Sequence, residues 1–267
     1  MLISRAQKTG LSLYATLTLL LFYFPLVCLL VAAVSQKRYF SFPYPLENVT
    51  TKWFAEAIAS EQVAEYVGVS LKIASLTTVL SVGIGFFAAL AYARHAWKCR
   101  RMFQKIVLLP LFFPQSVLGL ALLMWFNFLG VTPCWQTAVI AHTVWIAPIA
   151  TLIMAIQAYG LDPSLEEAAR DMGAGTPRIL ARITLPLMAP GMVSAACFSL
   201  LLSWGNFALS LYTTGADSAL PEWLYARMTG GYKPVVPAIG ILSVVAAVAV
   251  LLLLFGAMKL AAKRRAA

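Results

Sequence analysis

The 267-residue chain is poor in charge, and above all in acidic side chains. Charged residues make up 11% of it, with ten Asp and Glu against twenty Lys and Arg, while 61% of the residues are hydrophobic. The mean hydropathy is +0.83. Average soluble domains are about 25% charged and about 45–50% apolar. A soluble domain of this length cannot enclose so large an apolar excess in one core. The composition therefore argues against a soluble enzyme or a disordered chain and favours a membrane protein.

Motifs for nucleotide binding, catalysis and metal binding are missing as well. The chain has no G-x-x-x-x-G-K-[ST], no H-E-x-x-H and no G-x-S-x-G segment. Its four cysteines form no C-x-x-C pair, which argues against a disulfide framework or a zinc site. His142 lies within an apolar run, where a hydrogen-bonded role is favoured over a ligand or a proton relay. We expect no catalytic residue, no metal and no cofactor.

Long apolar runs are what the sequence has instead. Six runs of 24 to 26 residues are each long enough to cross a hydrocarbon core of roughly 30 Å as a helix. Backbone polar groups in lipid must be bonded within their own segment, and the alternation of a β-barrel is absent. We therefore predict an all-α membrane protein with six transmembrane helices in one domain, 1–267. The runs cover about 11–34, 67–92, 106–129, 136–159, 190–213 and 237–261.

The two ends of the chain and the first connection can also be assigned. The first run is longer than the apolar part of a signal peptide, so we expect it to be retained. With the N-terminus inside, fourteen Lys and Arg lie in inner segments and five in outer ones, which predicts that both termini are cytoplasmic. In the long outer segment 35–66, residues 42–45 are typical of a turn. Residues 53–66 suggest a short amphipathic helix at the outer interface, with a solvated loop as the alternative.

The inner connection 160–189 has a pattern of its own. Asp162-Pro163 is typical of a helix start, and the helix is expected over 164–172. Gly173 suits the left-handed position that follows a helix. Thr176-Pro177 opens a second short helix in the same way. A capped helix–turn–helix of this size is too small to be a domain, so we predict that it docks on another protein.

The same connection carries a spaced motif. Glu167-Ala168-Ala169 is followed after three residues by Gly173 and after nine more by Ile183-Thr184-Leu185-Pro186. This pattern resembles the EAA loop of binding-protein-dependent ABC importer permeases. Pro186 and Pro190 are expected to break the second short helix where the fifth run begins.

The resemblance implies a type I (MetI-like) importer permease in the bacterial inner membrane. Two such subunits, as a heterodimer or a homodimer, would form the pathway for a small solute. Two cytoplasmic ATPases would drive transport, and an extracytoplasmic binding protein would deliver the solute. The chain itself would be no enzyme. In the family the EAA helix sits on the ATPase, which implies an interface formed by Glu167, Ala168, Ala169, Asp171, Gly173, Ile183, Leu185 and Pro186.

Other segments are similar to permeases of the polyamine branch, namely 42–45, 51–54, 141–143, 202–204 and 220–224. Many such permeases carry an acidic pair in the fifth span, where this chain has Gly205-Asn206, and the six runs contain no Asp or Glu. A polyamine-like solute and a different class such as a phosphonate, an opine or iron therefore both stay open. Polar and aromatic residues within the runs are the candidates for the pathway: Trp125, Asn127, Ser203, Trp204, Asn206 and Tyr212.

Two other classes of protein are open alternatives. A proton-coupled secondary transporter would need ionisable residues within the runs and repeated halves. An intramembrane enzyme would need a nucleophile with a base, or a metal cluster, at the same depth. Ionisable residues are nearly absent from the runs, which favours the importer permease.

Overall fold

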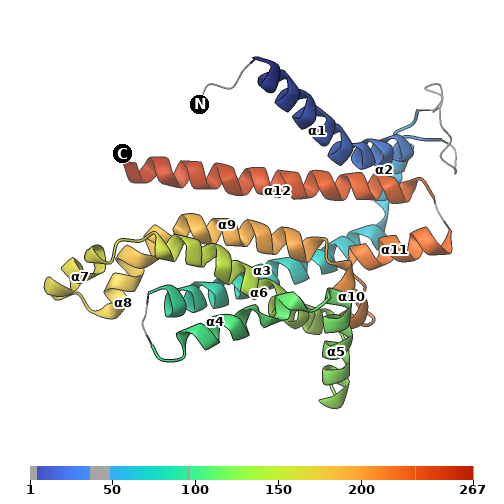
Figure 1. Ribbon diagram of the computed structural model, residues 1–267. Coiled ribbons are helices and arrows are strands. Elements are labelled where there is room, and N and C mark those ends of the chain that lie inside the picture. Colours follow the sequence, from blue (N-terminus) through green and yellow to red (C-terminus); the bar gives the residue numbers. More distant parts are fainter. Residues whose placement is uncertain (1–4, 37–48, 95–96, 232, 267) are drawn as a thin grey trace. The chain divides into compact units, whose positions relative to one another are not determined.

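The computed structural model describes residues 5–36, 49–94, 97–231 and 233–266 of the chain. These ranges are helical apart from connections and one isolated bridge between Ser35 and Val49, which confirms the predicted all-α class (Figure 1). The predicted turn at 42–45 lies outside the described residues. The elements are α1 (Arg5–Ala33), α2 (Lys52–Ala59), α3 (Glu61–Ala93), α4 (Arg100–Leu108), η2 (Leu109–Phe112), α5 (Gln115–Phe128), α6 (Trp135–Tyr159), α7 (Ser164–Asp171), α8 (Thr176–Ile179), the π-helical turn η3 (Leu180–Thr184), α9 (Leu185–Trp204), α10 (Phe207–Thr213), α11 (Leu220–Gly230) and α12 (Val235–Ala266).

Five helices among the described residues are long and apolar enough to cross a membrane. A sixth span results if the bent pair of 100–112 and 115–128 is taken as one. Five of the six predicted runs lie largely in the long helices, which are Gln7–Ala33, Glu61–Ala93, Trp135–Tyr159, Thr176–Trp204 and Val235–Gly256.

The third predicted run, 106–129, is not the single helix that its hydropathy suggests. The chain bends by 101° between η2 and α5. Phe113 is extended (φ −87°, ψ 136°), as a residue before proline prefers, and Pro114 has no N–H to continue the helical bonding. Two short helices therefore replace one long one.

The fifth predicted run, 190–213, differs at both of its ends. The prediction that Pro186 and Pro190 break the helix is wrong, because α8, η3 and α9 continue without interruption and Pro190 lies inside α9. Pro186 directly follows the π-helical turn, in which the N–H of Leu185 donates to the carbonyl of Leu180, so the regular bonding that a proline would interrupt is already shifted here. The break comes later, at Gly205 and Asn206, which separate α9 from α10.

The outer segment is also divided differently from the prediction. The amphipathic helix expected over 53–66 consists of α2 and the first turns of α3, separated by Ser60 in an extended conformation (ψ 112°).

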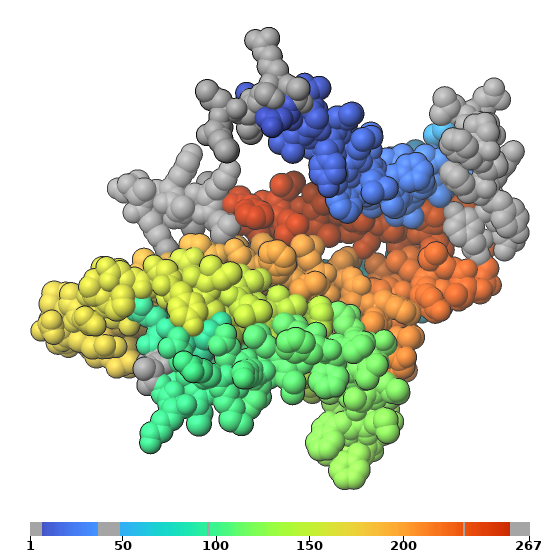
Figure 2. Space-filling model, viewed as in Figure 1, coloured from blue at the N-terminus to red at the C-terminus, as the bar shows by residue number. Residues whose placement is uncertain are grey.

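The chain forms two compact units, Met1–Val63 with Leu224–Val248 and Ala64–Trp223 with Ala249–Ala267. In the second unit α6 packs along α9, and α10 packs on both α5 and α6. Fully buried methionines, Met154 of α6 and Met188 of α9, belong to the core between these helices. The short helices α7 and α8 (yellow) form one end of this unit (Figure 2).

Candidate functional site

The connection between α6 and α9 is capped as its sequence predicts. The Asp162 side chain accepts a hydrogen bond from the backbone N–H of Ser164 (3.0 Å), and this bond lowers the pKa of the Asp162 carboxyl. At the other end of α7, Gly173 is left-handed (φ +82°). The N–H groups of Gly173 and Ala174 donate to the carbonyls of Arg170 (2.8 Å) and Ala169 (2.9 Å), which is a Schellman motif. Both ends of this eight-residue helix are therefore fixed by local bonds.

One face of α7 is open to its surroundings. Leu165 is 48% exposed and Met172 is 82% exposed. Two carboxylates, Glu167 and Asp171, are exposed beside these apolar side chains, as is Ala168. The face therefore combines apolar area with negative charge, a composition that suits contact with a protein surface.

The other residues of the predicted interface are placed differently. Ala169 is buried on the inner side of α7. Ile183 and Pro186 are half-buried in η3 and at the start of α9, and Leu185 is 40% exposed. The predicted set is thus divided among the open face of α7, its buried inner side and the helix that follows.

Glu166, which the motif does not include, is the residue that anchors α7. Its carboxylate lies 3.2 Å from a guanidinium nitrogen of Arg94, just beyond the end of α3, and accepts a hydrogen bond from the hydroxyl of Thr184 (2.9 Å) in η3. Arg170 approaches its other oxygen at 3.9 Å. Arg94 also donates to the carbonyl of Leu161 (2.8 Å). The available sequence signal was the three-residue spacing between Glu166 and the apolar Ala169, which puts both on one side of the helix.

His142 is hydrogen-bonded through both of its ring nitrogens. Its Nδ1 lies 2.8 Å from the hydroxyl of Ser203 in α9, and its Nε2 lies 3.0 Å from the hydroxyl of Ser210 in α10. All three side chains are buried. One ring nitrogen donates and the other accepts, and hydroxyls serve either need. His142 is thus hydrogen-bonded, as expected, and it links α6 to both sides of the α9–α10 break.

The remaining candidates for the pathway are distributed around this break and on α5. Asn206 is buried, and its side chain caps α10 by accepting from the N–H of Leu209 (3.0 Å). Trp204 is half-buried. Tyr212 is half-buried and packs on Gly119, where an added Cβ would meet its ring at 3.0 Å. On α5 itself, Trp125 and Asn127 are exposed.

A second polar cluster lies where α10 leads into α11. The hydroxyl of Thr214 lies 2.8 and 2.9 Å from the two carboxyl oxygens of Glu222 and 2.9 Å from the carbonyl of Ser210. Burial raises the pKa of the Glu222 carboxyl. Gly215 makes the turn here with φ +62°, and a Cβ there would come 2.1 Å from the carbonyl oxygen of Pro133.

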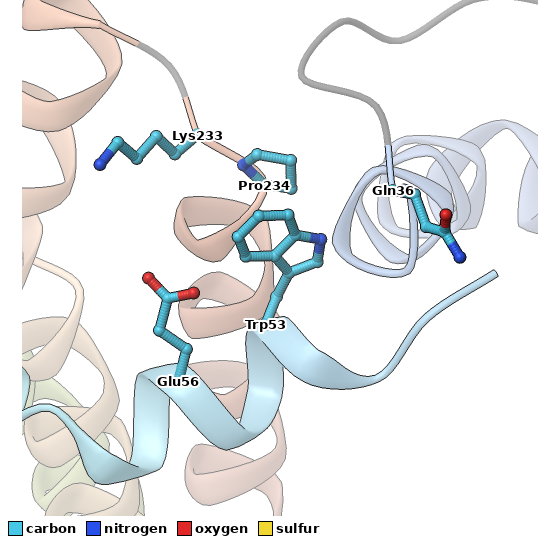
Figure 3. Close-up of a pocket in the computed structure, with 5 residues that line it drawn as sticks. All are labelled: Gln36, Trp53, Glu56, Lys233 and Pro234. Atoms are coloured by element: carbon cyan, nitrogen blue, oxygen red, sulfur yellow. The ribbon is translucent and has the colours of Figure 1, made fainter. Parts of the chain in front are cut away.

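The first unit contains a cavity of about 240 Å³ beside α2 (Figure 3). The indole of Trp53 lines it, and the indole N–H donates to the carbonyl of Ser35 (2.7 Å). Glu56 and Lys233 bring charges of opposite sign to this cavity, so it has no evident preference for an anion or a cation. The lining residues are Gln36, Trp53, Glu56, Lys233 and Pro234.

Comparison with known proteins gives the family. Residues 81–266 match the family model described as "Binding-protein-dependent transport system inner membrane component". PotC of Escherichia coli (strain K12), a spermidine/putrescine transport system permease protein, is 25% identical over 218 residues, which are 81% of this chain and 81% of PotC. ModB of the same organism, a molybdenum transport system permease protein, is 29% identical over 173 residues, 58% of this chain and 76% of ModB.

Solved structures agree in fold. A bacterial ABC transporter involved in the import of the acidic polysaccharide alginate has a chain that aligns with a TM-score of 0.68 at 18% identity, over 96% of this chain and 99% of that one. An inward-facing MetNI methionine ABC transporter aligns with a TM-score of 0.57 at 22% identity, over 73% and 89% of the two chains. Importers of this kind work as complexes with ATPase subunits and a periplasmic binding protein. The chain belongs to the family of binding-protein-dependent transport system inner membrane components, and it is the multi-pass permease subunit of a bacterial ABC importer whose ATPase is a separate subunit.

Proposed function

We propose that the open face of α7 is the surface on which the ATPase subunit docks. The observation that carries this proposal is the combination of Leu165 and Met172 with exposed carboxylates on a helix capped at both ends. Lipid would not favour the carboxylates, and water would not favour so much exposed apolar area. A protein partner satisfies both, through apolar contact and a basic patch beside Glu167 and Asp171.

This docking requires α7 to lie in the cytoplasm, and we propose that both termini lie there too. The supporting observation is the excess of Lys and Arg in the segments that this orientation places inside. A reporter fused after Arg265 should be active only as a cytoplasmic reporter, and one inserted beside Asn48 only as a periplasmic one. The reverse result at either position would contradict the orientation.

We further propose that the chain pairs with a second permease subunit around a pathway for a small polyamine-like solute. PotC, named for spermidine and putrescine, matches 81% of the chain, and PotI of the same organism, named for putrescine, matches 72%, whereas ModB matches 58%. Of the candidate pathway residues, Trp204 and Tyr212 would bind a cation through their rings and Asn206 through its amide, since the six predicted runs contain no carboxylate. A thermal-shift screen of the cognate binding protein with putrescine, spermidine and molybdate tests the solute class.

The docking proposal is tested by disrupting the open face of α7 in the assembled importer. Glu167→Lys reverses a charge on this face, and Met172→Asp places a charge at one of its two exposed apolar side chains. We expect both to insert into the membrane normally but to lose most of the co-purifying ATPase and of solute uptake. Met228→Asp, at a similarly exposed methionine of α11, is the matched control and should keep the ATPase. Full ATPase retention by both α7 variants would contradict the proposal.

A further inference from the structure

We infer that Glu166, rather than the exposed Glu167, is the residue that transmits movement of α7 to the membrane helices. This inference rests on the proposed docking of the ATPase on α7. A docked partner can drive transport only if the docking helix is fixed to the helices that must move. Among the described residues, the side-chain bonds that fix α7 to other elements converge on the carboxylate of Glu166.

The geometry places one carboxylate between three parts of the chain. Through Arg94 (3.2 Å) it holds the end of α3, and through the Thr184 hydroxyl (2.9 Å) it holds the last residue of η3, from which α9 continues. Arg94 uses another guanidinium nitrogen to bind the carbonyl of Leu161, where the chain leaves α6. A displacement of α7 therefore acts on α3, α6 and α9 together.

The environment makes this connection stiff. The Arg94 and Glu166 side chains are only 11% and 18% exposed, so the ion pair is poorly screened by water. Breaking such a pair from one side leaves a charge without its partner in a desolvated site, which is strongly unfavourable. The pair should therefore persist while α7 is displaced, instead of opening first.

The element that receives this connection is able to deform. Thr184 ends a π-helical turn, in which each N–H bonds to the carbonyl five residues back instead of four. Such turns occur often at functional sites. A pull on Thr184 can change the register of this turn without breaking α9. Glu167, by contrast, is exposed and forms no ion pair within the described part of the chain, which leaves it available to the partner.

The experiment separates docking from transmission. The complete importer, with both permease subunits, the ATPase and the binding protein, is reconstituted in liposomes, and solute uptake and ATP hydrolysis are measured in the same sample. For Glu166→Gln we expect normal co-purification of the ATPase and continued hydrolysis, with uptake per ATP reduced by about fivefold or more. Arg170→Gln is the control, because Arg170 is 55% exposed and its approach to Glu166 is long, at 3.9 Å. The Arg170→Gln variant should keep the wild-type ratio of solute uptake to ATP hydrolysis.

Two further variants keep the test decisive. Thr184→Val removes the second contact while leaving the ion pair, so it should fold and show a smaller loss of uptake per ATP. A double variant, Arg94→Glu with Glu166→Arg, exchanges the two charges of the pair. It should recover part of the uptake per ATP that Glu166→Gln loses. A wild-type ratio in Glu166→Gln overturns the inference, and if that variant does not assemble, a wild-type ratio in Thr184→Val overturns it. Loss of the ATPase from Glu167→Lys, with a normal ratio in Glu166→Gln, would leave docking supported and transmission refuted.

Discussion

At the scale of single residues, buried hydroxyls and one imidazole decide how the interrupted fifth run is held. His142 bonds to Ser203 before the break and to Ser210 after it, so one side chain of α6 holds the end of α9 and the middle of α10. Polar groups buried away from water need such partners, and an unmatched one costs about 1–3 kcal/mol.

Replacing His142 by leucine should therefore destabilise the second unit. The Ser203 hydroxyl would lose its partner, whereas the Ser210 hydroxyl would keep its bond to the carbonyl of Asn206 (2.7 Å), and we expect a loss of roughly 1–3 kcal/mol in unfolding free energy. The measurement is thermal unfolding of the purified permease in detergent, with Ser194→Ala as the control, since Ser194 is exposed and bonds only the carbonyl of Pro190 in its own helix. An unfolding temperature equal to that of the control would contradict this role for His142.

Glu222 gives a pH dependence with a definite sign. The single proton of the Thr214 hydroxyl cannot serve the Ser210 carbonyl and both carboxylate oxygens at once. A protonated Glu222 resolves this, and burial raises the pKa of this carboxyl accordingly. Because the folded state binds the proton more tightly than the unfolded chain, this contribution to stability is complete below the ordinary carboxyl pKa. It is lost as the pH rises through the raised value.

The prediction is that unfolding temperature declines with rising pH more steeply in the wild type than in Glu222→Gln. The amide resembles the neutral carboxyl in shape but does not titrate. Thermal unfolding of both proteins from about pH 4 to about pH 8 measures the difference. Parallel curves over this range would show that the carboxyl titrates without effect on folding.

At the scale of elements, two breaks interrupt the long helices, and polar side chains bond on both sides of the first of them. The break between α9 and α10 places Asn206 as the cap of α10 and puts Ser203 and Ser210 on either side of His142. At the second break, Phe113 and Pro114 turn α5 away from α4 and η2. In both cases a position that hydropathy alone assigns to the middle of a span is the start of a new helix.

Two variants at Asn206 distinguish a capping role of its side chain from a role in the solute pathway. Asn206→Leu removes the cap and should cost about 1 kcal/mol, whereas Asn206→Ser keeps a capping oxygen and should be nearly as stable as the wild type. Thermal unfolding measures the first effect and solute uptake the second. If the amide also contacts solute, Asn206→Ser will be stable yet transport poorly; normal uptake by this variant would assign Asn206 to capping alone.

Sequence reasoning reached some elements more readily than others, for physical reasons. Hydropathy identified the long helices because each of them alone satisfies its backbone in lipid. Local bonds made the Asp162 cap and the left-handed Gly173 predictable, since they involve neighbours in the chain. The Glu166–Arg94 pair was not predictable in this way, because its partners are far apart in sequence. The continuation through Pro186 was missed because a π-helical turn has no simple sequence pattern.

At the scale of the whole molecule, the chain is a permease subunit whose transport depends on a partner that hydrolyses ATP. Its open α7 face, its anchoring by Glu166 and its broken helices would then form one mechanical route from the ATPase to the solute. The family assignment gives the role of the subunit. The connection between α6 and α9 contains α7, whose open face is the proposed contact with the ATPase.

The most direct test of this account is a cross-link between α7 and the ATPase in the active importer. Met172→Cys is introduced after replacing the four native cysteines by serine, and membranes are treated with a short reagent that couples to this thiol at one end and inserts into any adjacent protein on illumination at the other. Met228→Cys, at the exposed methionine of α11, is the matched control. The account predicts a permease–ATPase product from Met172→Cys and none from Met228→Cys. An importer that still transports solute but gives no product from Met172→Cys, or gives one from Met228→Cys, would contradict it.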